Sequence, residues 1–304
     1  MNRILWSPNP EKIEKSKMNL FMRFVNQSCS QSIESYPELH RWSVDNLELF
    51  WKLVSDFLDI CYSSKSSNVM QVSDKIYQTK WFLGAKLNYA ENILRDRPLD
   101  SVSIEFFNEL NEYRSLTYRD LCDEVASVST FFKSAGLSKG DRVAAYMPNT
   151  IETVEAFIAT ISLGSIWSSC SPDFGTKGVI ERFSQINPKV LFITDIYFYN
   201  GKKINVLNRL PEILKSIPSI KSVVICNYPG KKLIKNKNEI KKKNFFRWSK
   251  IMQNNGEKIN FKNFDFETEL AILYSSGTTG KPKCICHRSG GVLIQHKKEH
   301  QLHC

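Results

Sequence analysis

The chain has 304 residues, of which 42% are hydrophobic and 12% aromatic, and its formal net charge is +11. These proportions exclude an intrinsically disordered chain and allow a sizeable core, in one large domain or two smaller ones. No apolar run approaches the ~20 residues of a membrane-spanning helix, and the first residues lack the apolar segment of a signal peptide, so we expect no membrane span and a location in the cytosol.

The first helices are predicted between residues 19 and 60. Apolar side chains recur there at spacings of three and four residues, the pattern of one buried helix face. They are Leu47, Trp51, Val54 and Leu58. Asp45 precedes this run and is the expected N-cap of its helix.

A regular alternation of strands and helices begins at residue 101. Residues 101–106 alternate like a strand, and Thr117 then opens a helix, with Asp120 as the second member of a partial capping box. Gly136 ends this helix. Its expected buried face consists of Leu121, Val125, Val128 and Phe132.

A second helix is predicted after the strand 142–146. Pro148 and Asn149 introduce this helix, and Gly164 stops it. The side chains expected to face inward are Val154, Phe157, Ile158 and Ile161.

The same alternation continues to the end of the chain. Further strands are predicted at 165–169, 190–194, 223–226 and 269–274, and further helices at 177–185, 206–217 and 245–254. Strands rich in Val, Ile and Phe that alternate with helices predict an α/β fold with a doubly wound, mostly parallel sheet. Ligands of such sheets gather at the carboxyl ends of the strands, where the segment after Tyr274 lies.

Much of the excess of basic over acidic residues lies in residues 231–243, a lysine-rich run that only Glu239 opposes. Asparagines rather than aromatic residues interrupt the run, so it offers no platform on which bases could stack. We interpret it as a solvated surface loop and expect no nucleic-acid partner. The alternative, a nucleic-acid-binding protein, would show steeply salt-dependent binding.

The segment with the clearest chemistry is a glycine loop that follows the strand 269–274. It reads Ser275-Ser276-Gly277-Thr278-Thr279-Gly280-Lys281-Pro282-Lys283. Its glycines expose backbone amides, its hydroxyls add donors, and Lys283 supplies a charge suited to phosphate oxygens. It is not a Walker A loop, because only two residues separate the glycines and Pro282 forbids the helix that such a loop opens.

This loop resembles the signature phosphate loop of the adenylate-forming enzymes. Other stretches are similar to the acetyl- and acetoacetyl-CoA synthetase branch of that family, at 81–92, 167–175, 182–189, 283–291 and 295–303. The resemblance extends from about residue 6 to residue 303 and is greatest to the acetoacetate-specific members.

The resemblance implies ATP-dependent ligation of acetoacetate to coenzyme A through an acyl-adenylate. The implied small-molecule partners are acetoacetate, ATP with Mg²⁺, and coenzyme A. The implied ATP-binding residues are Ser275, Ser276, Gly277, Thr278, Thr279, Gly280 and Lys283. Lys202, in the turn 199–202, is a candidate contact to the phosphates of coenzyme A, with a plain surface turn as the alternative.

Members of the family are longer than this chain. We therefore expect residues 1–98 to form a helical N-terminal region and residues 99–304 to form an AMP-binding domain that is truncated before completion, without the C-terminal lid domain. The catalytic residues are expected downstream of Cys304, none lies in the chain, and the chain alone is expected to be inactive. Two alternatives remain open: a non-catalytic nucleotide-binding isoform or fragment, and a relative of acetyl-CoA or propionyl-CoA synthetase.

Two groups of side chains have the composition of metal ligands. Cys284 and Cys286 are closer in sequence than the ~2–4 intervening residues of a zinc knuckle allow. His296, His300 and His303 could share a helix face, but no neighbouring carboxylate supports them. The eight cysteines show no framework spacing, so we expect reduced thiols and no metal site.

Overall fold

The computed structural model describes residues 5–230, 244–253, 256, 258–275 and 280–304. The chain forms two compact units. The first, here called the helical unit, combines residues 1–87, 265–267 and 290–304; the second, here called the sheet unit, combines residues 88–264 and 268–289. Among the described residues, no helix is both long and apolar enough to cross a bilayer.

The helical unit is built on aromatic packing between short helices. Its helices are α1 (Pro10–Lys15), α2 (Lys17–Cys29), α3 (Tyr36–Asp45), α4 (Leu47–Phe57), most of α11 (Ser289–Lys298), and the π-helical turn η3 (Glu299–His303). The ring of Phe21 on α2 lies 6.0 Å from that of Phe50 and 5.2 Å from that of Phe57, both on α4. Burying such rings supplies most of the stability of helices this short. The helices predicted between residues 19 and 60 are therefore confirmed.

Short strands complete the helical unit. β1 (Asn68–Gln71) pairs antiparallel with β2 (Lys80–Leu83), and the 3₁₀ turn η1 (Ile76–Gln78) lies between them. β3 (Lys86–Leu87) follows. Phe82 and Phe266 stack at 4.8 Å, which ties the end of β2 to the segment 265–267.

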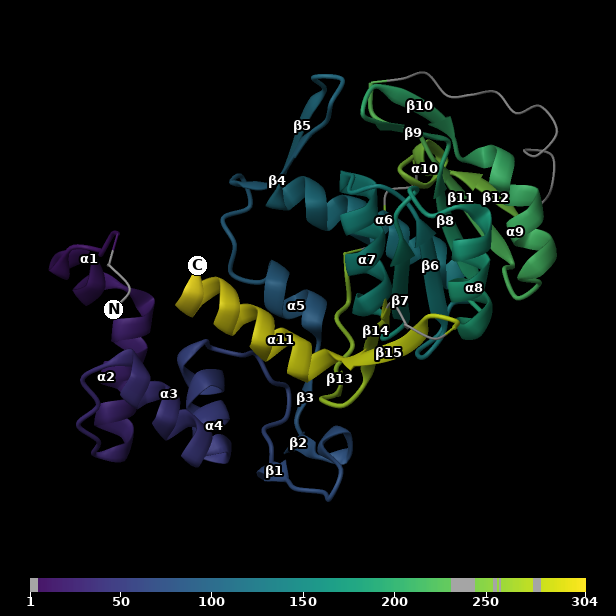
Figure 1. Cartoon of the computed structure of the whole chain (residues 1–304). Coiled ribbons are helices and arrows are strands. Elements are labelled where there is room, and N and C mark those ends of the chain that lie inside the picture. Colours follow the sequence, from purple (N-terminus) through teal and green to yellow (C-terminus); the bar gives the residue numbers. More distant parts are fainter. Residues whose placement is uncertain (1–4, 231–243, 254–255, 257, 276–279) are drawn as a thin grey trace. The chain divides into compact units, whose positions relative to one another are not determined.

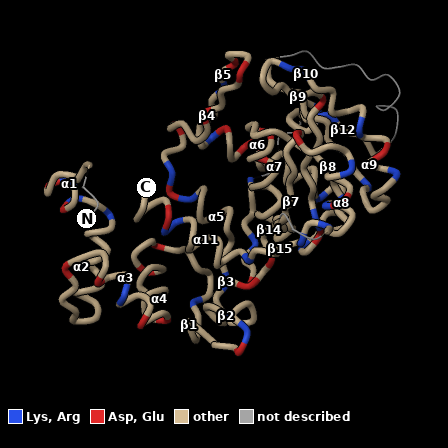
Figure 2. The backbone as a smooth tube through the Cα atoms, viewed as in Figure 1, with Lys and Arg blue, Asp and Glu red and all other residues tan. Residues whose placement is uncertain are grey.

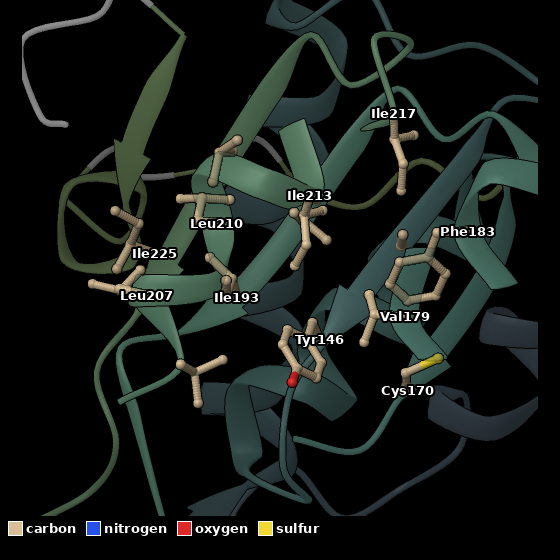
Figure 3. Packing of buried hydrophobic residues seen from close by; sticks show 14 of the residues in the cluster. Tyr146, Cys170, Val179, Phe183, Ile193, Leu207, Leu210, Ile213, Ile217 and Ile225 are labelled. Atoms are coloured by element: carbon tan, nitrogen blue, oxygen red, sulfur yellow. The ribbon is translucent and has the colours of Figure 1, made fainter. Parts of the chain in front are cut away.

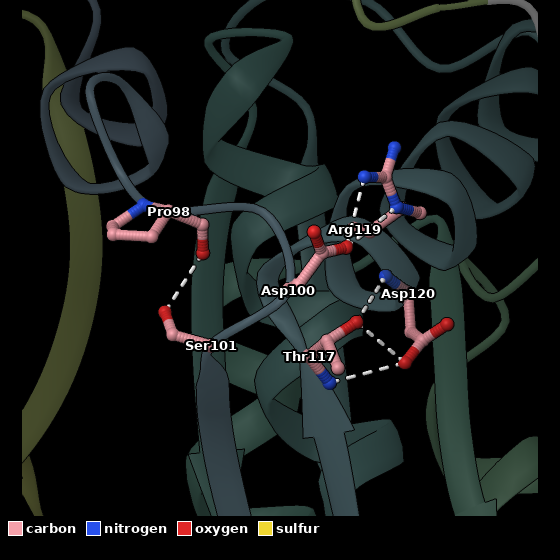
Figure 4. Close-up of polar contacts among 6 residues, drawn as sticks. All are labelled: Pro98, Asp100, Ser101, Thr117, Arg119 and Asp120. Atoms are coloured by element: carbon pink, nitrogen blue, oxygen red, sulfur yellow. Dashed lines mark hydrogen bonds and ion pairs between the residues drawn. The ribbon is translucent and has the colours of Figure 1, made fainter.

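Two helices begin with complete capping boxes. Ser35 and Glu38 form one at the start of α3. At the start of α6 (Tyr118–Ser134), the Thr117 hydroxyl accepts from the Asp120 amide at 3.1 Å, and the Asp120 carboxylate accepts from the Thr117 amide at 3.0 Å (Figure 4). The Thr117 hydroxyl also donates to the Asp120 carboxylate at 2.7 Å, and this bond, with the one from the Thr117 amide, lowers the pKa of the Asp120 carboxyl. The box predicted as partial is thus complete.

The sheet unit contains a seven-stranded sheet with the order β12-β11-β8-β6-β7-β14-β15. Its strands are β6 (Arg142–Tyr146), β7 (Ile166–Cys170), β8 (Val190–Thr194), β11 (Ser222–Cys226), β12 (Phe245–Arg247), β14 (Glu269–Ser275) and β15 (Lys283–Arg288). The first six in this order run parallel, and β15 pairs antiparallel with β14. This topology confirms the predicted mostly parallel sheet.

Helices cover both faces of this sheet (Figure 1). Alternate strand residues point to opposite faces, so Leu191 and Ile193 of β8 join a core with α8 (Thr176–Ile186) and α9 (Leu210–Ser216). Figure 3 shows that core, with Phe183 of α8 beside Val179. On the opposite face, Phe192 of β8 lies 5.8 Å from Phe132 of α6. The doubly wound arrangement follows.

Two hairpins and several short elements complete the sheet unit. β4 (Val102–Phe107) pairs antiparallel with β5 (Tyr113–Thr117), and β9 (Ile196–Tyr199) with β10 (Lys202–Asn205). The remaining elements are α5 (Tyr89–Leu94), α7 (Ile151–Ser162), the 3₁₀ turn η2 (Leu207–Arg209), α10 (Trp248–Ile251) and β13 (Phe264–Asp265), whose last residue belongs to the helical unit.

Two element predictions are wrong in detail. The expected helix 245–254 is a short edge strand, β12, followed by the single-turn α10, because Phe245 and Phe246 pair with β11. The expected helix 206–217 begins as the 3₁₀ turn η2 and becomes α-helical only at Leu210.

Three residue assignments are also wrong. Leu47, expected on the buried face of its helix, is the first residue of α4 and is 45% exposed. Asp45 is the last residue of α3, so the N-cap position of α4 falls one residue later, at Asn46. Val154 is 38% exposed, because Glu155 takes the inward position of α7 between Ile151 and Ile158.

Candidate functional site

The glycine loop connects two neighbouring strands at the end of the sheet order. β14 ends at Ser275 and β15 begins at Lys283. Because β14 runs parallel to β7, the loop leaves the sheet at the carboxyl ends of the parallel strands, as predicted. Pro282 precedes a strand rather than a helix, which separates this loop from the Walker A type.

Three of the predicted ATP-binding residues are described by the structure. Ser275 is half-buried, and Gly280 and Lys283 are exposed. Gly280 has a φ of +147°, a conformation that favours glycine, and no atom lies within 4 Å of the position a Cβ would occupy. Ser275 and Lys283 are ladder partners, so their side chains are neighbours at the mouth of the loop. The other four, Ser276, Gly277, Thr278 and Thr279, lie outside the described residues.

The strand that enters the loop is anchored by β7. The Ser168 hydroxyl, in a fully buried residue, bonds the Ile272 carbonyl oxygen at 2.8 Å and the Tyr274 hydroxyl at 3.0 Å. Burial raises the pKa of the Tyr274 phenol well above its usual range, so this group stays neutral and keeps its hydrogen bond. The residue before the loop therefore has a fixed position.

A cavity of about 420 Å³ opens at the same edge of the sheet. Its lining comes from the segments that follow β6 and β7 and from β9 itself, and includes Met147, Asn149, Ser171, Asp173, Tyr197 and Phe198. The mixture of aromatic faces and polar groups is typical of a site for a small organic ligand.

Tyr146 and Arg209 hold the loop after β7 against this edge. The Tyr146 hydroxyl, at the end of β6, donates to the Phe174 carbonyl oxygen at 2.5 Å. Arg209 donates to the carbonyl oxygens of Phe174, at 2.8 Å, and of Pro172, at 3.0 Å. Sequence reasoning missed both residues, because no local pattern shows that η2 folds back onto the loop after β7.

Lys202 lies at the tip of the hairpin β9–β10. Asn200 and Gly201 have φ values of +50° and +72°, the left-handed pair of a tight hairpin turn. Lys202 pairs with Tyr199 across the turn, and both side chains are exposed. The segment is therefore an exposed hairpin turn, and the Lys202 side chain is accessible to an anionic ligand.

The sequence predicts that neither the pair Cys284 and Cys286 nor the group His296, His300 and His303 binds a metal ion. Cys284 and Cys286 are exposed free thiols on β15. The rings of His296 and His300 lie 6.4 Å apart. Within the described ranges, no group of three His, Cys, Asp or Glu side chains has the geometry to hold a metal ion.

The lysine-rich run 231–243 lies outside the described residues. Along the part of the chain that is described, Lys and Arg are interspersed with Asp and Glu (Figure 2). The predicted absence of a nucleic-acid partner stays a prediction.

A doubly wound sheet whose β14 leads into a Ser-, Thr- and Gly-rich loop defines a class of nucleotide-using enzymes. The sequence profile described as "AMP-binding enzyme" matches residues 91–302, and the chain belongs to that family. A second profile, described as "Acetyl-coenzyme A synthetase N-terminus", matches residues 36–93.

Within this family, the chain is similar to several acetoacetyl-CoA synthetases. The chain is 38% identical to acetoacetyl-CoA synthetase of Macaca fascicularis, over 99% of this chain and 45% of that protein. It is 36% identical to acetoacetyl-coenzyme A synthetase of Rhizobium meliloti (strain 1021), over 99% of this chain and 46% of that protein. The structure of acetoacetyl-CoA synthetase from Streptomyces lividans matches with a TM-score of 0.91 and 34% identity, over 100% of this chain and 46% of that one. The chain therefore spans less than half the length of these relatives.

Proposed function

We propose that this chain supplies the phosphate-binding part of an acid–thiol ligase that joins acetoacetate to coenzyme A through an acyl-adenylate. The observation that carries the proposal is the glycine loop between β14 and β15, at the carboxyl edge of the sheet. The similarity to acetoacetyl-CoA synthetases over 99% of the chain supports the choice of acid.

In the proposed reaction, a carboxylate oxygen of acetoacetate attacks the α-phosphorus of ATP, and the bond to the bridging oxygen of pyrophosphate breaks. The thiolate of coenzyme A then attacks the acyl carbon and releases AMP. Negative charge develops on the pyrophosphate in the first step. Amides of the loop and the ammonium group of Lys283 would stabilise that charge, and such positioning of charge supplies most of the catalysis in this kind of transfer.

Mg²⁺ would enter this site with the nucleotide. Mg²⁺ is commonly held by substrate phosphates and one or two protein oxygens, and it keeps several waters. The Ser275 hydroxyl, at the mouth of the loop, would supply a protein oxygen of this kind. The residues present therefore fit a metal that arrives bound to ATP, where it would neutralise phosphate charge.

Coenzyme A is assigned to the hairpin β9–β10. The exposed Lys202 would contact a phosphate of coenzyme A. Tyr197 and Phe198 of β9 line the 420 Å³ cavity, so one hairpin carries both the cation and part of that cavity. Lys202→Ala is expected to weaken coenzyme A binding about three-fold in low salt, measured by calorimetry.

MgATP binding to the purified chain, measured by calorimetry, tests the loop assignment. Lys283→Met is expected to weaken binding roughly ten-fold, because it removes a charged hydrogen-bond donor. Lys281→Met is the matched control, since Lys281 is also exposed and lies two positions away. No binding by the wild type, or equal losses in both variants, would refute the assignment.

Exchange of labelled pyrophosphate into ATP tests the chemistry. Exchange that depends on acetoacetate, and exceeds that with acetate, supports the full ligase reaction for this chain. MgATP binding without exchange supports a nucleotide-binding part whose chemistry needs residues outside this sequence.

A further inference from the structure

Helix α8 contacts both ends of the glycine loop. The Gln185 side-chain amide donates to the Pro282 carbonyl oxygen at 3.0 Å, just before β15 begins. The Arg182 guanidinium lies 5.8 Å from the ring centroid of Tyr274, just before β14 ends. One face of one helix thus meets the residues on either side of the loop.

The Arg182 side chain is held in place by its own helix and by the loop after β7. Its Nη1 donates to the Gly178 carbonyl oxygen at 2.8 Å. The guanidinium also lies 4.1 Å from the ring centroid of Phe174. A cation close to two aromatic rings is attracted to both, so Arg182 restrains Tyr274 without needing a carboxylate partner.

Gln185 is fixed in the same way. Its side-chain nitrogen also donates to the Glu181 carbonyl oxygen, at 2.8 Å. A primary amide has two N–H donors, so one is used within α8 and the other reaches Pro282. Because Arg182 and Gln185 are three residues apart, they lie on one face of α8.

We propose that Arg182 and Gln185 are positioning residues for ATP binding, which hold Tyr274 and Pro282 so that Ser275 and Lys283 keep their spacing at the phosphates. This inference rests on the proposed function, because it assigns the loop to the polyphosphate of ATP. Neither residue needs to touch the nucleotide. Their contribution is to reduce the freedom the loop loses when it binds.

The test combines two measurements on the 304-residue chain. Hydrogen exchange of the amides of Gly280, Lys281, Lys283 and Cys284, without nucleotide, reports how firmly the loop end is held. Gln185→Leu and Arg182→Met are expected to speed that exchange about ten-fold and to weaken MgATP binding about five-fold. Gln185→His keeps an N–H donor and should recover most of the affinity. Ser184→Ala, an exposed change on the same helix, is the matched control.

The outcomes separate the two ideas. Unchanged exchange in both variants would overturn the inference, whether or not the chain binds nucleotide. Faster exchange with unchanged MgATP affinity would refute the positioning role alone. Faster exchange in a chain whose wild type binds no MgATP would refute the proposed function.

Discussion

A buried carboxyl group on α7 makes the stability of the sheet unit depend on pH. Glu155 is 0% exposed. Burial raises its pKa well above the usual 4.5, and the neighbouring Glu124 and Glu152 add to the effect. Arg114 opposes the rise, but its guanidinium lies 2.6 Å from the Glu152 carboxylate. The folded chain therefore holds a proton that the unfolded chain releases above about pH 4.5.

The magnitude follows from that difference in proton binding. The stability is complete below the unfolded pKa of 4.5 and falls by about 1.4 kcal/mol per pH unit until the folded pKa is reached. At pH 7 the protonated carboxyl thus costs roughly 3 kcal/mol. This cost depends only on the unfolded pKa, because the folded value lies far above neutrality.

Glu155→Gln removes the proton uptake and keeps the shape of the side chain. Its free energy of unfolding, relative to wild type, should therefore increase by about 2.7 kcal/mol between pH 6 and pH 8. Urea unfolding followed by tryptophan fluorescence at several pH values measures this difference. Glu212→Gln, an exposed change on α9, should leave the pH dependence unaltered. Parallel curves for wild type and Glu155→Gln would refute the reasoning.

Three further changes have expected effects on the free energy of unfolding. Arg114→Met leaves the Glu152 carboxylate, which is 7% exposed, without its cation. The expected cost is about 2 kcal/mol, less than for a fully buried ion pair because the Arg114 side chain is 37% exposed. In urea unfolding, the double variant with Glu152→Gln should recover most of this loss. Phe183→Ala empties a fully buried position between α8 and the sheet and should cost about 3–5 kcal/mol; a loss under 1 kcal/mol would contradict the packing. Thr117→Ala removes the cap of α6 and should cost about 1 kcal/mol, whereas Thr117→Ser should cost little, as thermal melting would show.

Strong local patterns predicted much of this fold. The strands 142–146 and 190–194 each contain a continuous run of four apolar residues, and the helix after Thr117 has a clear buried face, so local sequence agrees with the final structure there. The glycine loop was found in the same way, because the order of Ser, Gly, Thr, Lys and Pro in residues 275–283 has few alternative uses.

The errors lie where tertiary contacts decide. Phe245 and Phe246 were assigned to a helix because their apolar character suits either element, and only pairing with β11 makes them a strand. A charged side chain is expected on the exposed face of a helix, but Glu155 lies on the buried face of α7. Its carboxyl is tolerated there because burial raises its pKa and keeps it protonated. The contact between Gln185 and Pro282 joins distant parts of the chain, so no local pattern could show it.

The antiparallel ladder between β14 and β15 has a consequence for variation in the loop. Side chains along a strand alternate between the two faces of a sheet, and Lys283 is held opposite Ser275 by backbone pairing. Substituting one small residue for another in the segment between Ser275 and Lys283 leaves the Lys283 ammonium group on the same side of the sheet. Inserting a single residue at the start of β15 and shifting the pairing by one would turn that charge to the other side, away from the proposed phosphate site. The chain can therefore tolerate changes in what the loop is made of more readily than changes in where its strands are paired.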